Sequence, residues 1–72
     1  MKEVLIFKTS VNSKEEVELV AELFDMNSSI KKWSFDLNDP DRILRVECLN
    51  ISPESIEDLL EFEGIYCTNM EY

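Results

Sequence analysis

Apolar residues recur along this chain with two different spacings, which divide it into six segments. Four segments show the alternation or the short apolar run of a strand, and two show the three-to-four-residue spacing of an amphipathic helix. Strands are expected at residues 3–9, 30–37, 42–49 and 65–72, and helices between residues 13 and 27 and between residues 52 and 64. The predicted order is therefore strand, helix, two strands, helix, strand.

Both expected helices carry signals at their ends. Ser13 and Glu16 form a capping box, in which the serine hydroxyl accepts from the third helical N–H and the glutamate accepts from the N–H of the serine. This helix is expected to end near Met26 and Asn27, where the asparagine can adopt the left-handed cap conformation. Ser52 precedes a proline, which is typical of a helix start, and Gly64 is suited to end the second helix.

The faces of the strands indicate how the elements pack. Residues 4–7 are apolar on both alternations, which predicts a central strand, whereas Leu44, Val46 and Cys48 alternate with outward polar residues. Two right-handed crossovers around a hairpin at residues 38–41 place both helices on one face of a four-stranded antiparallel sheet. We therefore predict an α+β, ferredoxin-like βαββαβ sandwich that forms one domain over residues 1–72, with the first and third strands central.

Length and charge restrict the class of protein. The 72 residues are 44% hydrophobic, which is enough for a folded core and too much for a disordered tail. Sixteen acidic and seven basic residues give a net charge of −9, which repels nucleic acids and anionic membranes and favours a basic or neutral protein surface. The apolar run at residues 4–7 is too short for a signal peptide or a membrane span, so a cytoplasmic location is expected.

The chain has few of the residues that most often serve as catalytic nucleophiles or as ligands of soft metals. The chain has no histidine, and its two cysteines, Cys48 and Cys67, fall on strands about 10 Å apart, which is too far for a disulfide. We expect both to be core residues and predict neither an enzyme nor a cofactor. Residues 36–41 place oxygen atoms at alternate positions like a calcium loop, but Asp41 stands where that loop needs glycine, so a turn is expected.

The landmarks around the first loop resemble the heavy-metal-associated domains of metallochaperones and metal-transporting ATPases. Those domains carry the pattern Met-x-Cys-x-x-Cys at the end of the first strand. At the start of their last strand, they carry a glycine followed by an aromatic or aliphatic residue. Here Lys8 stands at the position of the methionine, and Ser10 and Ser13 stand at the positions of the two cysteines. Gly64 and Ile65 match the glycine and the aliphatic residue that begin the last strand. The resemblance implies a soft-metal loop, but serine hydroxyls do not ionise near neutral pH and bind soft metals poorly, so we expect metal binding to be lost.

Two functional hypotheses follow. The leading one is a non-enzymatic interaction or regulatory module without bound metal. The alternative is a small-ligand or metal-handling domain that uses the loop at residues 9–13. ACT-like regulatory domains have the same order of elements and bind amino acids near a first loop that contains glycine, whereas residues 10–13 contain none.

Two surfaces are candidates for contact with another protein. Nine of the sixteen acidic residues lie on the two helices, which either dock a basic partner or are simply solvated. The outer face of the sheet is expected to expose aromatic and apolar residues that contact another chain or a second copy, unless they are merely exposed at the chain end. The candidate residues are Glu18, Glu22, Glu57 and Glu61 on the helices and Tyr66, Met70 and Tyr72 on the last strand.

Overall fold

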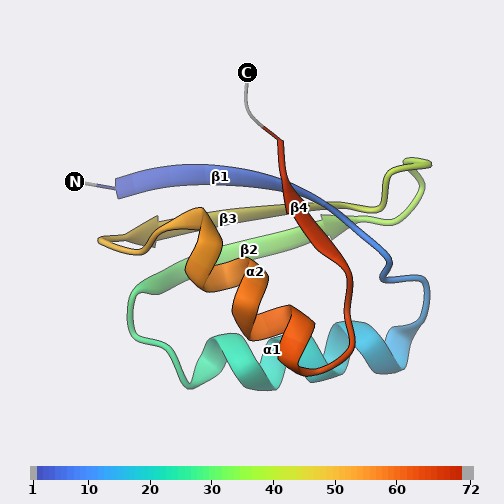
Figure 1. The fold of residues 1–72 in the computed structure, drawn as a ribbon, viewed down its shortest axis with the longest axis horizontal. Helices are drawn as coiled ribbons and strands as arrows, with labels where there is room; N and C mark the ends of the chain where they lie inside the picture. Colours follow the sequence, from blue (N-terminus) through green and yellow to red (C-terminus); the bar gives the residue numbers. More distant parts are fainter. Residues whose placement is uncertain (1, 71–72) are drawn as a thin grey trace.

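A computed structural model of the protein describes residues 2–70 and has the predicted order of elements. The elements are β1 (Lys2–Thr9), α1 (Lys14–Asp25), β2 (Ile30–Asp36), β3 (Ile43–Leu49), α2 (Pro53–Phe62) and β4 (Cys67–Asn69). The strands form one antiparallel sheet in the order β2-β3-β1-β4, and both helices lie on the same side of it (Figure 1). The ferredoxin-like βαββαβ fold, with β1 and β3 at the centre, is confirmed.

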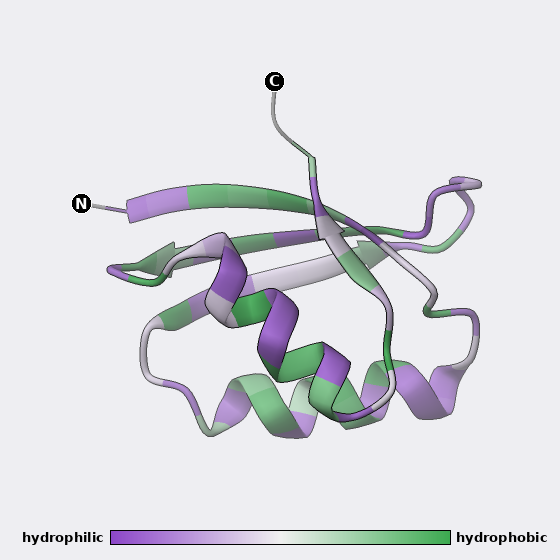
Figure 2. Cartoon of the chain, in the orientation of Figure 1, coloured by the Kyte–Doolittle hydropathy of each residue, from purple (hydrophilic) through white to green (hydrophobic). Residues whose placement is uncertain are grey.

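The core lies between the sheet and the helices because one alternation of each central strand is apolar. Phe7 of β1 and Leu44 of β3 have no exposed surface, and the apolar middle of β1 is visible in Figure 2. Phe24 of α1 packs edge-on against Trp33 of β2, with the ring centroids 5.7 Å apart. The buried apolar residues are Phe7, Val11, Val20, Phe24, Ile30, Leu44, Val46, Cys48, Ile56, Leu60, Ile65 and Cys67.

The capping box of α1 is present with one difference. Ser13 Oγ accepts from the backbone N–H of Glu16 at 3.2 Å, as predicted. Glu16 Oε1, however, accepts from the N–H of Asn12 at 3.1 Å, one residue before the serine that the pattern indicates. Because this oxygen also accepts from the Ser13 hydroxyl at 3.4 Å, it is held on the side of the loop where the Asn12 amide lies.

The prediction for the end of α1 is right in position, because the helix ends at Asp25, and wrong in the conformation of its cap. The cap residue is Met26 in right-handed geometry, and among residues 2–70 only Arg42, Asn50 and Gly64 have positive φ. Asn27 instead uses its side chain, whose Oδ1 accepts from the backbone N–H of Ser29 at 3.0 Å. The asparagine therefore stabilises the turn into β2 rather than a left-handed cap.

The last strand is shorter than predicted. Gly64, at φ 81°, donates its N–H to Glu61 O at 2.9 Å, and Ile65 donates to Leu60 O at 3.0 Å. These two bonds form a Schellman motif, which closes α2 and takes Ile65 into the helix cap. Pairing with β1 therefore begins at Cys67, and the predicted strand residues 71–72 lie outside the described residues.

The hairpin between β2 and β3 also corrects a boundary. Arg42, expected in the strand, has φ 49° and belongs to the loop. Its backbone N–H donates to Asp39 O at 3.0 Å and its Nη1 donates to Leu37 O at 2.8 Å. The backbone of Arg42 therefore closes the loop, and β3 begins one residue later, at Ile43.

Candidate functional site

The loop between β1 and α1, residues 10–13, is tied to the start of the last strand by Ser10. The Ser10 N–H donates to Tyr66 O at 3.0 Å. Ser10 Oγ accepts from the Tyr66 N–H at 2.9 Å. The hydroxyl therefore stands in for a backbone carbonyl in the ladder between two segments that are 56 residues apart in the chain.

Ser13, the second candidate position in this loop, is occupied in a similar way. Its Oγ accepts from the Glu16 N–H and donates to the Glu16 carboxylate, so the side chain caps α1. The structure thus places Ser10 and Ser13 in one loop, as the sequence predicts, but it gives each hydroxyl a backbone N–H as partner. Two neutral hydroxyl oxygens that already accept hydrogen bonds make a weak ligand set for a soft cation.

Thr9 is the last residue of β1, and the sequence did not reveal its role. Only 9% of its surface is exposed. Its Oγ1 donates to Arg42 O at 2.7 Å and accepts from the Val11 N–H at 3.2 Å. Thr9 therefore joins the end of β1 to the hairpin loop and fixes the path of the loop above Val11, which is fully buried.

Replacing Thr9 by valine should destabilise the domain by about 1–3 kcal/mol, because the buried Val11 N–H and the Arg42 carbonyl would lose their partner. Chemical denaturation monitored by circular dichroism measures this. Thr9→Ser keeps the hydroxyl, loses one methyl group and should cost roughly 1 kcal/mol or less. A Thr9→Val variant as stable as the unsubstituted protein would contradict the bridging role.

The two thiols lie in the core and not in the loop. Cys48 has no exposed surface and Cys67 is 3% exposed. Burial, assisted by the charges of Glu57 and Glu61, raises the pKa of Cys67 to about 12, and burial also raises the pKa of Cys48. Both therefore stay protonated at neutral pH, and a protonated thiol is neither a nucleophile nor a metal ligand.

No cluster of three or more histidine, cysteine or carboxylate side chains suited to a metal occurs among residues 2–70. In the segment at residues 36–41, Asp36 Oδ1 accepts from the Asn38 N–H at 3.2 Å, and Asp39 Oδ1 accepts from the Asp41 N–H at 2.8 Å. These are the local bonds of a turn, so the predicted turn is confirmed.

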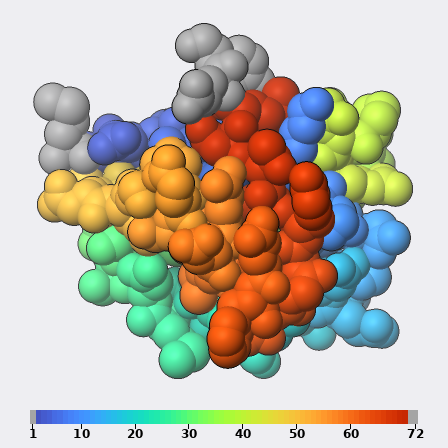
Figure 3. Space-filling model, in the orientation of Figure 1, coloured from blue at the N-terminus to red at the C-terminus, as the bar shows by residue number. Residues whose placement is uncertain are grey.

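The candidate acidic residues are not equivalent. Glu18, Glu22 and Glu61 are exposed, whereas Glu57 is half-buried and its Oε2 accepts from the backbone N–H of Asn69 at 2.7 Å. Figure 3 shows the side chains of α2 and of the segment that leads into β4 as one continuous surface. Glu57 therefore helps to hold β4 at the edge of the sheet, a structural role that the sequence did not indicate.

The second group of candidates was expected on the face of the sheet opposite the helices. Tyr66 is 67% exposed, Met70 is half-buried and Tyr72 lies outside the described residues. We call this surface the open sheet face and define it by the outward residues of the strands, chiefly Val4, Ile6, Lys8, Lys32, Ile43 and Arg45. Val4, at 52% exposure, shows that apolar residues of a central strand reach this surface.

Phe62 is an exposed aromatic residue that sequence reasoning missed. It is the last residue of α2 and is 88% exposed. Around the axis of α2, Phe62 lies about 120° from the buried Ile56, on the side that faces away from the core. This angle, which follows from the sequence, could have identified Phe62 as exposed. Phe62 therefore adds an exposed apolar side chain at the C-terminal end of the acidic helix α2.

Comparisons with known proteins identify the fold. No protein-family model and no curated protein matches the chain. The structure is similar to the apo HMA domain of the copper chaperone for superoxide dismutase, with a TM-score of 0.81 and 15% identity over 99% of this chain and 69% of that one. It is also similar to the Cu(I)-loaded first domain of the human copper chaperone for SOD1, with a TM-score of 0.79 and 16% identity over 96% and 93% of the chains.

A third neighbour comes from a transporter. The yeast copper transporter domain CCC2A, solved in its apo and Cu(I)-loaded states, has a TM-score of 0.80 and 14% identity over 94% of each chain. Neither helix of the described chain is long and apolar enough to cross a membrane. At these identities the likeness extends to the backbone alone, so the chain has the fold of a heavy-metal-associated domain.

Proposed function

We propose that this domain is a non-enzymatic protein-interaction or regulatory module that retains the scaffold of a heavy-metal-associated domain without its soft-metal site. The observation that carries the proposal is the bonding of the β1–α1 loop. Ser10 and Ser13 each use their hydroxyl oxygen to accept a backbone N–H. Both hydroxyls are thus occupied by backbone partners at the positions where the resembling family places two cysteines.

The surroundings of the loop support the same conclusion. Lys8, at the family's methionine position, is a cation whose Nζ lies 3.9 Å from Asp41 Oδ1. Its charge repels a metal ion, and Val11 fills the space beneath the loop with a fully buried side chain. A small ligand held by residues 9–13 would have to displace Val11 or break the Thr9 bonds, which is why the alternative function is less favoured.

The proposed partner is a protein with a basic or neutral surface, in agreement with the net charge of −9. The exposed carboxylates of Glu18, Glu22 and Glu61, together with the exposed ring of Phe62, give the helical side charged and apolar groups for such a contact. A cytoplasmic location and the absence of catalysis are part of this proposal.

Native mass spectrometry tests the proposal. The reduced protein is incubated separately with Cu(I), Zn(II) and Ca(II), and we expect the apo mass in every case, because residues 2–70 provide neither paired thiolates nor a carboxylate cluster. A heavy-metal-associated domain with intact cysteines serves as the positive control. One equivalent of any of the three metals retained by this chain would contradict the proposal.

A further inference from the structure

The negative charge of the chain is concentrated on its helices. Of the sixteen acidic and seven basic residues, α1 and α2 hold nine and one, the basic residue being Lys14. The other segments are nearly balanced, and both lysines of β1 are already paired with carboxylates. A charged partner is therefore selected mainly by the helical side, which favours a cationic one.

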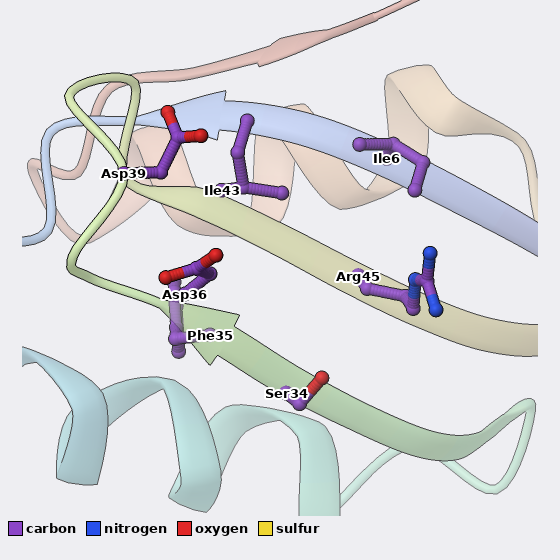
Figure 4. Close-up of a pocket in the computed structure, with 7 residues that line it drawn as sticks. All are labelled: Ile6, Ser34, Phe35, Asp36, Asp39, Ile43 and Arg45. Carbon is purple, nitrogen blue, oxygen red and sulfur yellow. The ribbon is translucent and has the colours of Figure 1, made fainter.

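The hollow of the open sheet face does not select a partner by charge. It has a volume of about 400 Å³, and Figure 4 shows Arg45 at one end of it with Asp36 and Asp39 at the other. A charged group of either sign would meet both an attraction and a repulsion there. A contact that depends on charge is therefore favoured on the helical side instead.

A second hollow, of about 320 Å³, lies between the two helices. Leu23 and Met26 line it from the end of α1, and Leu59 lines it from α2. Asn27 and Ser28 complete the lining from the turn that follows α1. We call this hollow the inter-helix groove; Figure 3 shows this end of α1, in green, beside the orange surface of α2. Because most of its lining is apolar, the groove can accept an apolar side chain of another molecule.

Two large apolar side chains are exposed beside this groove. Met26 is 85% exposed, and Phe62 is 88% exposed. Phe62 lies one helical turn after Leu59 on the same side of α2, because side chains three positions apart in a helix are neighbours. Apolar residues that gather on a surface and are bordered by polar ones mark contact sites, whereas scattered ones need no explanation.

The border of the groove on α1 is negatively charged. Glu22 lies one turn before Met26, and Asp25 directly precedes it; both carboxylates are exposed. The last turn of α1 contains no basic residue, although the carbonyl groups at a helix C-terminus favour a cation and Asp25 adds a like charge. Lys31, the next basic residue along the chain, pairs with neither carboxylate, and neither has another ion pair within residues 2–70. An external cation would relieve this unfavourable arrangement.

We propose that the inter-helix groove binds a basic amphipathic helix of a partner protein. An apolar side chain of that helix would enter the groove, with Met26 and Phe62 packed against its apolar neighbours. Lysine or arginine beside the apolar stripe would pair with Glu22 and Asp25 and would face the carbonyl groups at the end of α1. A helix suits the groove because it separates an apolar stripe from charged flanks. The inference rests on the proposed interaction function and adds the location and chemistry of the contact.

Charge distinguishes this partner from other occupants. A second copy would bring one acidic helical side against another, and a nucleic acid or an anionic membrane would be repelled in the same way. An uncharged apolar segment would cover Met26 and Phe62 but would leave the carboxylates at the border of the groove without a partner. A basic amphipathic helix satisfies both groups.

The test uses the full chain labelled with ¹⁵N and a synthetic peptide of about four helical turns, with leucine along one face and lysine elsewhere. We expect saturable NMR shift changes at the amides of residues 22–28 and 59–62. A control peptide has the same composition, but its leucines are distributed around the helix. It should bind at least about fivefold more weakly, because it presents no apolar stripe to the groove.

Two pairs of matched variants locate the contact. Met26→Ala should weaken the affinity at least about fivefold, whereas Tyr66→Ala, which truncates an exposed residue outside the groove, should leave it within about twofold. Asp25→Asn should weaken the affinity about fivefold. Asp41→Asn removes the same charge at the hairpin loop, far from the end of α1 (Figure 1), and should leave the affinity within about twofold.

Several outcomes would overturn the inference. These are an absence of shifts at residues 22–28, equal affinity for the two peptides, equal effects of the variants and their controls, and equal binding of a peptide with glutamate in place of lysine. Concentration-dependent shifts of the same amides without peptide would assign the groove to self-association instead. Because none of the readouts involves metal, failure here is distinct from a failure of the metal-free loop on which the proposed function rests.

Discussion

A Phe7→Ala variant should be largely unfolded at 25 °C. Phe7 lies on the central strand β1 and has no exposed surface, so its truncation removes buried apolar area and leaves a cavity. Such a substitution costs about 3–5 kcal/mol. The total free energy of unfolding of a domain of this size is also roughly 3–5 kcal/mol, so the substitution removes about all of it. Circular dichroism and denaturant titration measure the loss.

The chain offers a matched control in Phe62→Ala. The same residues are exchanged, but Phe62 is 88% exposed, so the free energy of unfolding should change by no more than about 0.5 kcal/mol. Equal denaturation midpoints for the Phe7 and Phe62 variants would show that the described core is incorrect.

The second large effect is a gain of metal binding. Replacing both Ser10 and Ser13 by cysteine should produce a chain that binds one Cu(I), where the unsubstituted chain binds none. The loop already leads into the N-terminus of α1, where unpaired N–H groups and the helix dipole lower the pKa of a thiol. Thiolates are preferred ligands of Cu(I). Native mass spectrometry of the reduced variant measures the number of Cu(I) ions bound per chain.

The single variants Ser10→Cys and Ser13→Cys are the controls for this gain. Each provides one loop thiolate, so neither should retain Cu(I) against a chelator as the double variant does. The core thiols cannot substitute for the missing ligand, because Cys48 and Cys67 are buried in the sheet. A folded double variant without bound metal would show that the loop lacks the geometry of the family it resembles.

The predictable parts of the structure were those controlled by neighbouring residues. Alternation in β3 and the apolar spacing in α2 located these elements, since both patterns follow from the local repeat of the backbone. The end of the chain was less predictable because two local signals compete there. The residues after Gly64 favour a strand, but the hydrogen bond from Ile65 to Leu60 extends the helix cap at the expense of β4.

The candidate site was predictable in location and not in detail. Sequence alone placed Ser10 and Ser13 in the first loop, and it explained Ser13 as a helix cap. It could not reveal that Ser10 bonds to Tyr66, or that Thr9 bonds to Arg42, because those partners are 56 and 33 residues away. Such contacts depend on the folded sheet, which brings the ends of β1 and β4 together.

The most direct test of the central claim is a competition for Cu(I) between the unsubstituted, reduced chain and a chromophoric chelator. The account predicts that the chelator keeps all of its Cu(I) at every protein concentration, because the hydroxyl oxygens of Ser10 and Ser13 already accept the backbone N–H groups of Tyr66 and Glu16. The Ser10→Cys/Ser13→Cys chain, measured in parallel, should withdraw one equivalent. Stoichiometric withdrawal of Cu(I) by the unsubstituted chain would contradict the account.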